Sequence, residues 1–412
     1  MTRPRRVFAL DLGTTKVCCA VADMESTGLR VLGVGEAPSR GVRKGAVIDL
    51  DTAAESVAEA VDIAEQMAGI PIDSAVVGIA GGHITSQNSR GVVAVAARGE
   101  VRDYDVNRAI DAARAVSVPS DREIVHVLPQ QFTIDGQEGV RDAVGMSGTR
   151  LEVDAHIITG AHTAIQNVVK VAHKAGLDVE DMVLQVLASA DATVGRDEIE
   201  RGVVVADVGG GTTDVAVFSK GSIVHTAVIP VGGNHVTSDL AVGLRCDLET
   251  AETVKRNYGH CLELTLPADA EVTLTPLGYD EPQPIPQRYL AEIIGPRARE
   301  MASLIAAEVE RAGPVGLFPG GIVLTGGGAL LRGFAEVTQQ ESDLPARVAT
   351  PAGMHGMNDE IRGPGHATVV GLLTWSARNG RRQRAARNNG HAHSNNGNGA
   401  GNRFGRWLRD LF

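Results

Sequence analysis

The sequence predicts an α/β protein built from two related halves, each with a mixed β-sheet. The main observation is a repeated order of strand, glycine-rich turn and strand: Asp11-Leu-Gly-Thr-Thr-Lys16 follows the apolar run Val7–Leu10, and Asp207-Val-Gly-Gly-Gly-Thr-Thr-Asp214 follows Gly202–Ala206. A third glycine-rich turn, Gly326–Gly328, again ends an apolar run. Because glycine lets backbone N–H groups approach a phosphate closely, we expect the two turns to face each other and hold a nucleotide in a cleft.

The overall composition is that of a soluble globular protein. The 412 residues are 43% hydrophobic and 22% charged, and the length suffices for two or more domains. No apolar run is long enough to span a membrane, and the first residues lack the apolar stretch of a signal peptide. Cys18, Cys19, Cys246 and Cys261 have no zinc-type spacing, so we expect reduced thiols in a cytoplasmic protein, with no transition-metal site.

Charge is distributed unevenly along the chain. The net charge is −11, yet the residues from Arg378 onward contain eight arginines and only one acid, Asp410. This tail therefore carries +7 and the rest of the chain −18. An acidic body disfavours nucleic acid as a partner, whereas the basic tail indicates an anionic surface.

Helical and strand patterns alternate through the first half. Thr52–Glu55 has the capping-box pattern of a helix start, and Ser74–Ala80 predicts a buried strand that ends in a glycine pair. Residues 84 to about 160 then read as a small α+β insert, in which Asp105 is placed to cap a helix. A second capping box, Thr163–Gln166, predicts the helix that follows the insert.

The second half begins at Gly202 and repeats the order. Leu248–Tyr258 predicts a helix, and a long helix from about Arg288 to Arg311 is expected to be interrupted near Gly295-Pro296. The packed core is expected to end near Trp375. We divide the chain into a first core unit (1–83 and 163–200), an inserted α+β unit (84–162), a second core unit (201–240 and 321–378), a small unit of the second half (241–320), a disordered linker (379–401) and a terminal amphipathic helix (402–412).

Together these motifs resemble the actin, Hsp70 and sugar-kinase superfamily of ATP-binding proteins. In that resemblance Asp11–Lys16 and Asp207–Asp214 are the phosphate loops and Leu324–Leu331 is the adenosine motif. Gln185–Ala190 and His366–Gly371 are the two connecting helices. The resemblance implies an actin-like two-domain fold, with duplicated mixed-sheet cores around a nucleotide cleft, and ATP with Mg²⁺ as the cofactors.

The resemblance also implies which residues bind the nucleotide. They are Asp11, Gly13, Thr14, Thr15, Lys16, Asp207, Gly209, Gly210, Gly211, Thr212, Thr213, Asp214, Gly232, Gly233, Asn234, Glu252, Lys255, Gly326, Gly327, Gly328 and Leu330. The threonine hydroxyls and Lys16 suit phosphate oxygens, and Asp11 and Asp207 suit Mg²⁺ held through water. Turn capping is the alternative role for the two aspartates.

Two further assignments leave alternatives open. Glu252 and Lys255 flank the ribose and adenine by resemblance, although an i, i+3 pair on a helix is also an ordinary surface ion pair. Gln185 stands where relatives carry a polar residue that positions the attacking water, but a neutral amide is a poor general base. We therefore expect at most a weak ATPase.

The last residues have the pattern of a helix that lies on a membrane. On a helical wheel the large apolar residues Phe404, Trp407, Leu408, Leu411 and Phe412 fall on one side, and Arg403, Arg406 and Arg409 fall on the other. Such a helix binds anionic lipid at the interface, and docking back onto the core is the alternative. The segment is short, so a single copy should bind weakly.

The superfamily motifs with this tail resemble the FtsA family of bacterial cell-division proteins. Ser39–Asp49 is similar to an early signature of that family, the insert occupies the place of its extra subdomain, and Glu292–Arg297 is similar to its helix in the second half. The resemblance implies a filament-forming adaptor at the cytoplasmic face of the cell membrane, at the division septum. It would tether FtsZ through the FtsZ C-terminal peptide, with Arg288 and Arg297 as candidate contacts, and recruit later division proteins.

Other functions remain open on the same fold. A small-molecule kinase would need an aspartate base facing the cleft and would not use the terminal helix. An Hsp70-like chaperone would need a substrate domain after the ATPase core. A pilus-assembly actin-like protein would be expected to lack the lipid-binding tail.

Overall fold

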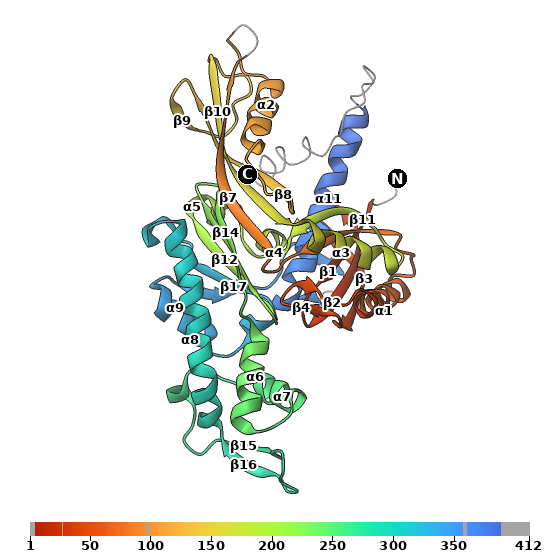
Figure 1. The fold of residues 1–412 in the computed structure, drawn as a ribbon, viewed down its shortest axis with the longest axis vertical. Coiled ribbons are helices and arrows are strands. Elements are labelled where there is room, and N and C mark those ends of the chain that lie inside the picture. Colours follow the sequence, from red (N-terminus) through yellow and green to blue (C-terminus); the bar gives the residue numbers. More distant parts are fainter. Residues whose placement is uncertain (1–4, 27, 96–98, 357–360, 389–412) are drawn as a thin grey trace.

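The computed structural model describes residues 5–26, 28–95, 99–356 and 361–388, shown in Figure 1. Two sheets form the centre of the molecule, with helices between them and on their outer faces. A third sheet lies at one end of the long axis, and a small helical unit with a short hairpin lies at the other.

The first sheet contains six strands in the order β11-β6-β1-β2-β3-β19. Its strands are β1 (Arg5–Leu12), β2 (Lys16–Glu25), β3 (Gly28–Pro38), β6 (Ser74–Ile79), β11 (Asp178–Leu184) and β19 (Met354–Gly356). β1, β2 and β3 form an antiparallel meander, and β6 and β11 continue the sheet in parallel. The helices α1 (Leu50–Ala68) and α3 (His162–Lys174) cover the outer face, and a short pair, β4 (Val42–Arg43) and β5 (Ala46–Val47), lies before α1.

The second sheet repeats this topology. Its five strands follow the order β14-β13-β12-β17-β18: β12 (Val203–Val208), β13 (Thr213–Ser219), β14 (Ser222–Ile229), β17 (Ile322–Thr325) and β18 (Ala346–Val348). β12, β13 and β14 form the antiparallel meander, and β17 and β18 add in parallel. The architecture is therefore the duplicated α/β arrangement that the repeated turns predict.

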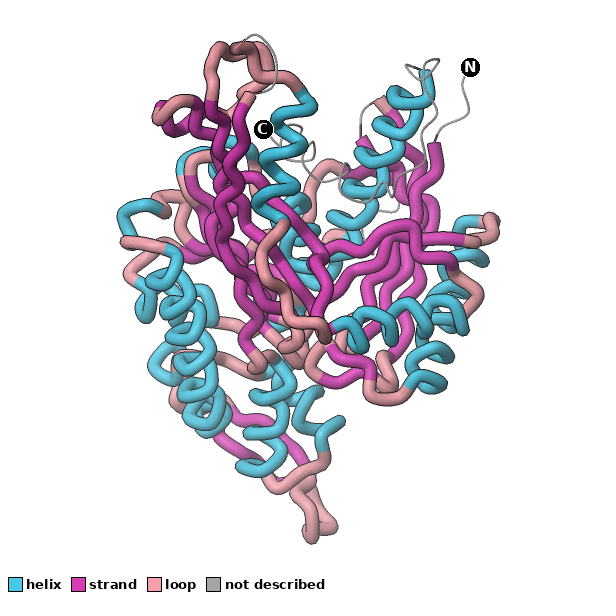
Figure 2. Tube along the Cα trace, turned by 45° about the horizontal axis from the view of Figure 1, so that its top comes forward, coloured by secondary structure: helices cyan, strands magenta, loops and turns pink. Residues whose placement is uncertain are grey.

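Two helices fill the space between the sheets. α4 (Gln185–Thr193) and α11 (Ala367–Asn388) pack on the inner faces of both sheets, and one apolar core joins all four elements. Figure 2 shows the strands of the two sheets, with helical segments between them and on their outer sides. Gly371 makes the contact possible, because a Cβ at this position would lie 1.8 Å from the carbonyl oxygen of Ala188.

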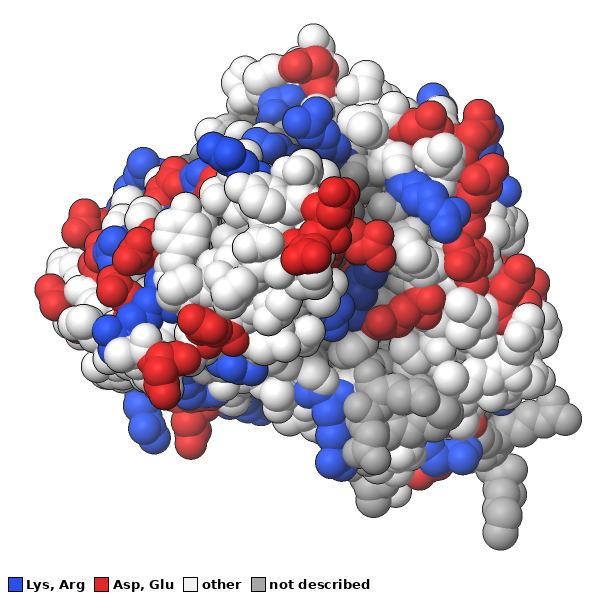
Figure 3. All heavy atoms as spheres, turned by 90° about the horizontal axis from the view of Figure 1, so that it is seen from below, with Lys and Arg blue, Asp and Glu red and all other residues white. Residues whose placement is uncertain are grey.

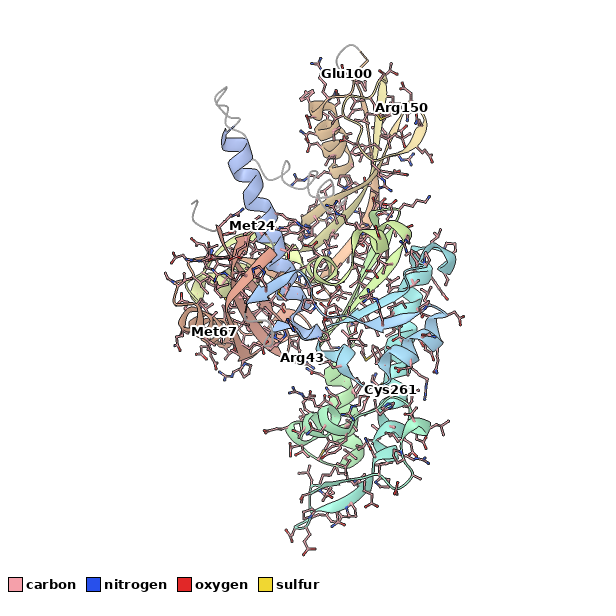
Figure 4. The ribbon with its side chains drawn as sticks, turned by 180° about the vertical axis from the view of Figure 1, so that it is seen from behind. Met24, Arg43, Met67, Glu100, Arg150 and Cys261 are labelled. Carbon is pink, nitrogen blue, oxygen red and sulfur yellow. The ribbon has the colours of Figure 1, made fainter. Side chains whose placement is uncertain are left out.

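The insert forms the third sheet. Its antiparallel order is β7-β10-β8-β9, with β7 (Ile84–Ala94), β8 (Arg122–Ile134), β9 (Gln137–Val140) and β10 (Arg150–Ala161), and α2 (Asp103–Arg114) packs on one face. Figure 4 places Glu100 and Arg150 at the outer end of this unit. At its inner end the insert meets β14, where Ser86 Oγ donates to the carbonyl oxygen of Thr226 at 2.9 Å.

The remaining elements belong to the second half. The helices are α5 (Arg196–Arg201), α6 (Gly233–Leu244), α7 (Leu248–Tyr258), α8 (Gln287–Ala312) and α9 (Phe334–Ser342), with short 3-10 turns at Glu263–Thr265, Val315–Leu317, Gly327–Leu330 and Pro364–His366. β15 (Glu271–Leu274) and β16 (Gln283–Pro286) form a hairpin at the end of the molecule. A second apolar core joins α6–α9 to the outer face of the second sheet.

Several helix boundaries differ from the predicted ones. α1 begins at Leu50 because the carboxylate of Asp49 accepts hydrogen bonds from the N–H groups of Asp51 and Thr52, so Thr52 is not its cap. α3 begins at His162 without a side-chain cap. Asp105 caps α2 as predicted, but from the third helical position, where its carboxylate accepts a hydrogen bond from the N–H of Arg102 at 3.1 Å. α8 continues through Pro296, because residues on both sides of it are buried in the same core.

The helix α11 extends further along the chain than predicted. We predicted a disordered linker from residue 379, but α11 continues to Asn388. The physical reason is composition: residues 381–387 are arginine, glutamine and alanine, which have high helix propensity. The rest of the predicted linker, 389–401, and the predicted terminal helix, 402–412, lie outside the described residues.

Candidate functional site

The two glycine-rich turns lie against each other between the halves. Gly13–Thr15 joins β1 to β2, Gly209–Thr212 joins β12 to β13, and a Cβ built on Gly210 would lie 2.3 Å from Thr15 Cγ2. A side chain here would collide with the facing turn, so the approach requires glycine. The turns bound a cleft of about 1370 Å³. Figure 3 shows a hollow between the halves with charged side chains of both signs around it.

Most of the residues predicted for nucleotide binding line this cleft, although they come from distant parts of the chain. They are Asp11, Gly13, Thr14, Thr15, Lys16, Asp207, Gly209, Gly210, Gly211, Thr212, Asp214, Gly233, Asn234, Glu252, Lys255, Gly326, Gly327, Gly328 and Leu330. Gln185 lines the cleft as well. The structure therefore brings together the motifs that the sequence separates.

Two predicted residues do not line the cleft. Thr213 is buried, and its hydroxyl donates to the carbonyl oxygen of Val231 at 2.9 Å, because successive residues of a strand point to opposite faces. Gly232 packs backbone against backbone: a Cβ there would lie 2.6 Å from the carbonyl oxygen of Gly209. Its role is to let α6 approach the second turn.

Three buried carboxylates lie at the floor of the cleft. Asp11 and Asp207 each lie next to the last residue of their strands, β1 and β12, and Asp214 faces Asp207 across the β12–β13 pair. Asp207 Oδ2 accepts hydrogen bonds from Ser189 and from Thr368 Oγ1, the latter at 3.0 Å. Asp214 Oδ2 accepts from Thr212 Oγ1 at 3.0 Å, and Asp214 Oδ1 is buried with no partner among the described residues.

The electrostatics of this floor favour a cation. Burial, and then the charge of Asp207, raise the pKa of Asp11 to about 7 and that of Asp214 to about 8. Burial also raises the pKa of Asp207, against the hydrogen bonds from Ser189 and Thr368. Three buried carboxylates that disfavour their own ionisation are suited to a divalent cation, which would neutralise them. The unpartnered Asp214 oxygen fits such an ion.

Gln185 lies at the first position of α4, beside Asp11. Its Nε2 donates to Asp11 Oδ1 at 2.9 Å and lies 3.4 Å from the carbonyl oxygen of Leu12. With the amide nitrogen fixed in this way, the amide oxygen is the remaining atom for a water. The geometry suits orientation of a water molecule and not proton abstraction.

Glu252 and Lys255 form the other end of the cleft. Lys255 Nζ lies 2.6 Å from Glu252 Oε2, 2.8 Å from Thr237 Oγ1 and 3.2 Å from the carbonyl oxygen of Gly233. The Lys255 side chain is only 13% exposed. The pair is therefore part of a fixed network beside α6 and not a solvated helix pair.

Several cleft residues escaped the sequence analysis. Ser189 and Thr368, on α4 and α11, hold Asp207, while Glu36 and His366 contact Lys16. Ser189 and Thr368 fall inside the helices we predicted, where a polar residue among apolar ones was an available signal. No comparable signal marks Glu36 and His366 in the sequence, because a glutamate at a strand end and a histidine at a helix start are ordinary surface residues.

The candidate partner residues already have partners within the chain. Arg297 Nε donates to Asp239 Oδ2 at 2.7 Å, Arg297 also pairs with Glu300, and Arg288 donates to the carbonyl oxygen of Leu266 at 2.9 Å. These side chains are partly exposed, so an acidic ligand could replace the present partners only by competing with them.

The predicted membrane residues Arg403–Phe412 lie outside the described residues. Among the described helices, none is long and apolar enough to cross a membrane.

Comparison with known proteins identifies the family. The family model "Cell division protein FtsA" matches residues 204–371, and "SHS2 domain inserted in FTSA" matches residues 81–159, the insert. FtsA of Pseudomonas aeruginosa is 43% identical over 372 residues, covering 90% of this chain and 89% of the relative. The chain belongs to the FtsA family. FtsA of Bacillus subtilis is 38% identical, covering 91% and 84%, and FtsA of Escherichia coli K12 is 36% identical, covering 91% of each chain.

Solved structures show that this FtsA-family chain has the predicted actin-like fold. The PilM–PilN type IV pilus biogenesis complex matches with a TM-score of 0.64 at 16% identity, covering 90% of this chain and 98% of that one. MreB5 of Spiroplasma citri bound to AMPPNP matches with a TM-score of 0.56 at 16% identity, covering 93% and 99%. At these identities the likeness concerns the fold alone.

Proposed function

We propose that this chain is an ATP-binding cell-division protein that assembles at the cytoplasmic face of the membrane at the division septum and tethers FtsZ to it. Its membership of the FtsA family supports the role in division. One observation supports ATP as the ligand: two glycine-rich turns meet above three buried carboxylates. A phosphate chain with a divalent cation satisfies both parts of that arrangement.

ATP with Mg²⁺ is the cofactor that these residues fit best. The N–H groups of the turns and the hydroxyls of Thr14, Thr15 and Thr212 would take the phosphates, and Asp11 and Asp207 would hold the cation through water. Asp214 joins this set, because one of its oxygens has no partner among the described residues. When bound, the cation would neutralise charge that the burial of these carboxylates makes costly.

Hydrolysis would be slow. Gln185 can orient a water molecule, but its amide is a poor general base and is already hydrogen-bonded to Asp11. A slow ATPase suits a switch in which bound nucleotide sets the conformation of the cleft. A small-molecule kinase receives no support from the family assignment.

The membrane contact would be made by Arg403–Phe412. The sequence pattern places three arginines opposite five large apolar residues, which suits the interface of an anionic bilayer. Filament formation would present many copies at once, and simultaneous binding would convert a weak anchor into a firm one. A pilus-assembly role has only the fold in its favour.

The FtsZ peptide would bind the small unit that ends in the β15–β16 hairpin. Exposed apolar side chains gather on its elements and connecting loops: Val242, Leu248, Leu264, Leu277, Tyr279 and Tyr289. Arg288 and Arg297 lie on α8, the helix that carries Tyr289, and would meet acidic groups of the peptide. Such apolar patches rimmed by charge are typical of protein-binding sites.

Nucleotide titration tests the cleft. We expect Asp207→Asn to weaken Mg-ATP binding by about tenfold or more, because the variant removes one of the cation-holding carboxylates. Asp62→Asn, which makes the same change on the exposed face of α1, serves as the control and should bind like the parent. Isothermal titration with Mg²⁺ or with EDTA measures both. Equal affinity of the two variants would contradict the assignment.

A further inference from the structure

A compact group of charged side chains lies at the edge of the cleft, beyond the predicted motifs. Lys16 Nζ and His366 Nε2 both contact Glu36 Oε1, and the two nitrogens lie 3.0 Å apart. The three side chains come from the start of β2, the end of β3 and the turn before α11. All three line the cleft. One anionic oxygen is thus held between two nitrogen atoms.

The backbone around this group also converges on the cleft. A Cβ built on Gly365 would lie 3.9 Å from Lys16 Nζ and 3.6 Å from the N atom of Gly327. The first phosphate loop, the third glycine turn and the segment before α11 therefore meet at one point. The Glu36 carboxylate occupies a place where a phosphate oxygen would find the same two donors.

We propose that His366 is a phosphate-binding residue and that Glu36 is an internal competitor, a carboxylate that holds Lys16 and His366 until a nucleotide phosphate replaces it. The inference rests on the proposed function and adds to it a contact and a means of regulation. On binding, the phosphate takes the donors of Lys16 and His366, and Glu36 loses both partners. Because Glu36 is anionic, it also repels the incoming phosphate.

The charges of the group are consistent with this exchange. Burial alone would raise the pKa of Glu36, but hydrogen bonds from His366 and Lys16 outweigh it and lower the pKa to about 2. The carboxylate is therefore ionised at neutral pH and acts as a true counterion. Its side chain is 40% exposed, so it can swing away when displaced.

A metal ion is the alternative to a phosphate as the ligand of this group. The Cys18 sulfur lies within 4.8 Å of ligand atoms of Glu36 and His366. However, Lys16 already supplies the positive charge beside Glu36, and burial raises the pKa of the Cys18 thiol well above its usual value. A neutral thiol beside an ammonium group suits an anion better than a cation.

The test compares ATP with adenosine on the full chain by isothermal titration in the presence of Mg²⁺. We expect Glu36→Gln to bind ATP about fivefold more tightly than the parent and adenosine equally well, because only the phosphates meet the freed donors. His366→Gln should bind ATP more weakly, and in the double variant the gain from Glu36→Gln should shrink. Glu55→Gln, an equal charge change on the exposed face of α1, is the control.

The outcomes separate this inference from the proposed function. ATP binding by the parent that Glu36→Gln leaves unchanged or weakens would refute the competitor role and leave the cleft assignment standing. Tighter binding of adenosine as well would also refute it, because Glu36 would then act through the cleft as a whole. Absence of ATP binding by the parent would overturn both. Zn²⁺ binding that Glu36→Gln abolishes would show a metal site instead.

Discussion

At the scale of single residues, several buried side chains are ionisable or polar, and burial makes such a group costly unless a hydrogen-bond or charge partner compensates it. Asp11, Asp207 and Asp214 lie in a buried floor, where burial raises the pKa of each carboxyl and makes its charged form costly without a compensating ligand. Some buried polar groups outside this floor are hydrogen-bonded within the chain. His156 is the clearest case, with Nδ1 2.7 Å from Asn88 Oδ1 and Nε2 2.9 Å from Thr226 Oγ1.

The buried histidines predict a loss of stability in acid. Burial lowers the pKa of His126 and of His156 to about 3, in each case below the value of 6.5 for a free histidine. A histidine with a lowered folded-state pKa stabilises the fold fully above pH 6.5, and that contribution is lost as the pH falls towards 3. Each should therefore cost about 1.4 kcal/mol of unfolding free energy per pH unit below 6.5.

Urea unfolding of a matched pair of variants measures this effect. His156→Gln should lower the free energy of unfolding at pH 7.5 and flatten its decline between pH 7.5 and 5.5. His173→Gln, on the exposed face of α3, should leave the decline unchanged. An identical pH dependence for parent and His156→Gln would show that His156 is not buried as a neutral ring.

At the scale of elements, α4 and α11 join the two sheets and carry the residues that hold Asp207. Their contact depends on Gly371, where a Cβ would lie 1.8 Å from the carbonyl oxygen of Ala188. Ser189 on α4 and Thr368 on α11 both donate to Asp207, so the spacing of the helices sets the geometry of the cleft floor.

A single methyl group tests this coupling. Gly371→Ala should lower the free energy of unfolding by about 1–3 kcal/mol, because the helices must separate, and should weaken ATP binding through the displaced Asp207. Thermal unfolding and titration with Mg-ATP measure the two effects. Gly316→Ala, at a glycine with open space around it, is the control. A normal stability and affinity for Gly371→Ala would contradict the role of this contact.

The sequence predicts the elements that repeat and the turns that need glycine, because both follow from backbone constraints. It predicts the cleft for the same reason. It does not predict that Glu36 and His366 meet Lys16, since these residues lie 20 and 350 positions from it and only the fold unites them. Strand alternation was a usable signal at Thr213, because it turns this side chain away from the cleft that Thr212 and Asp214 line.

At the scale of the whole molecule, the proposed partner site and the outer end of α11 lie toward opposite ends. Figure 1 shows the β15–β16 hairpin at one end of the long axis, while the outer part of α11 rises toward the end that holds the insert. The cleft is lined by Thr368 of α11 and by Glu252 and Lys255 of the small unit, so both parts contribute to it.

Recruitment of FtsZ to lipid tests the central claim most directly. The measurement is co-sedimentation of FtsZ filaments with anionic liposomes in Mg-ATP, using the full chain and a variant that lacks Arg403–Phe412. We expect the full chain to bring FtsZ into the liposome pellet and the shortened chain to leave it in the supernatant while still binding ATP. Equal recruitment by the two chains, or none by the full chain, would contradict the account.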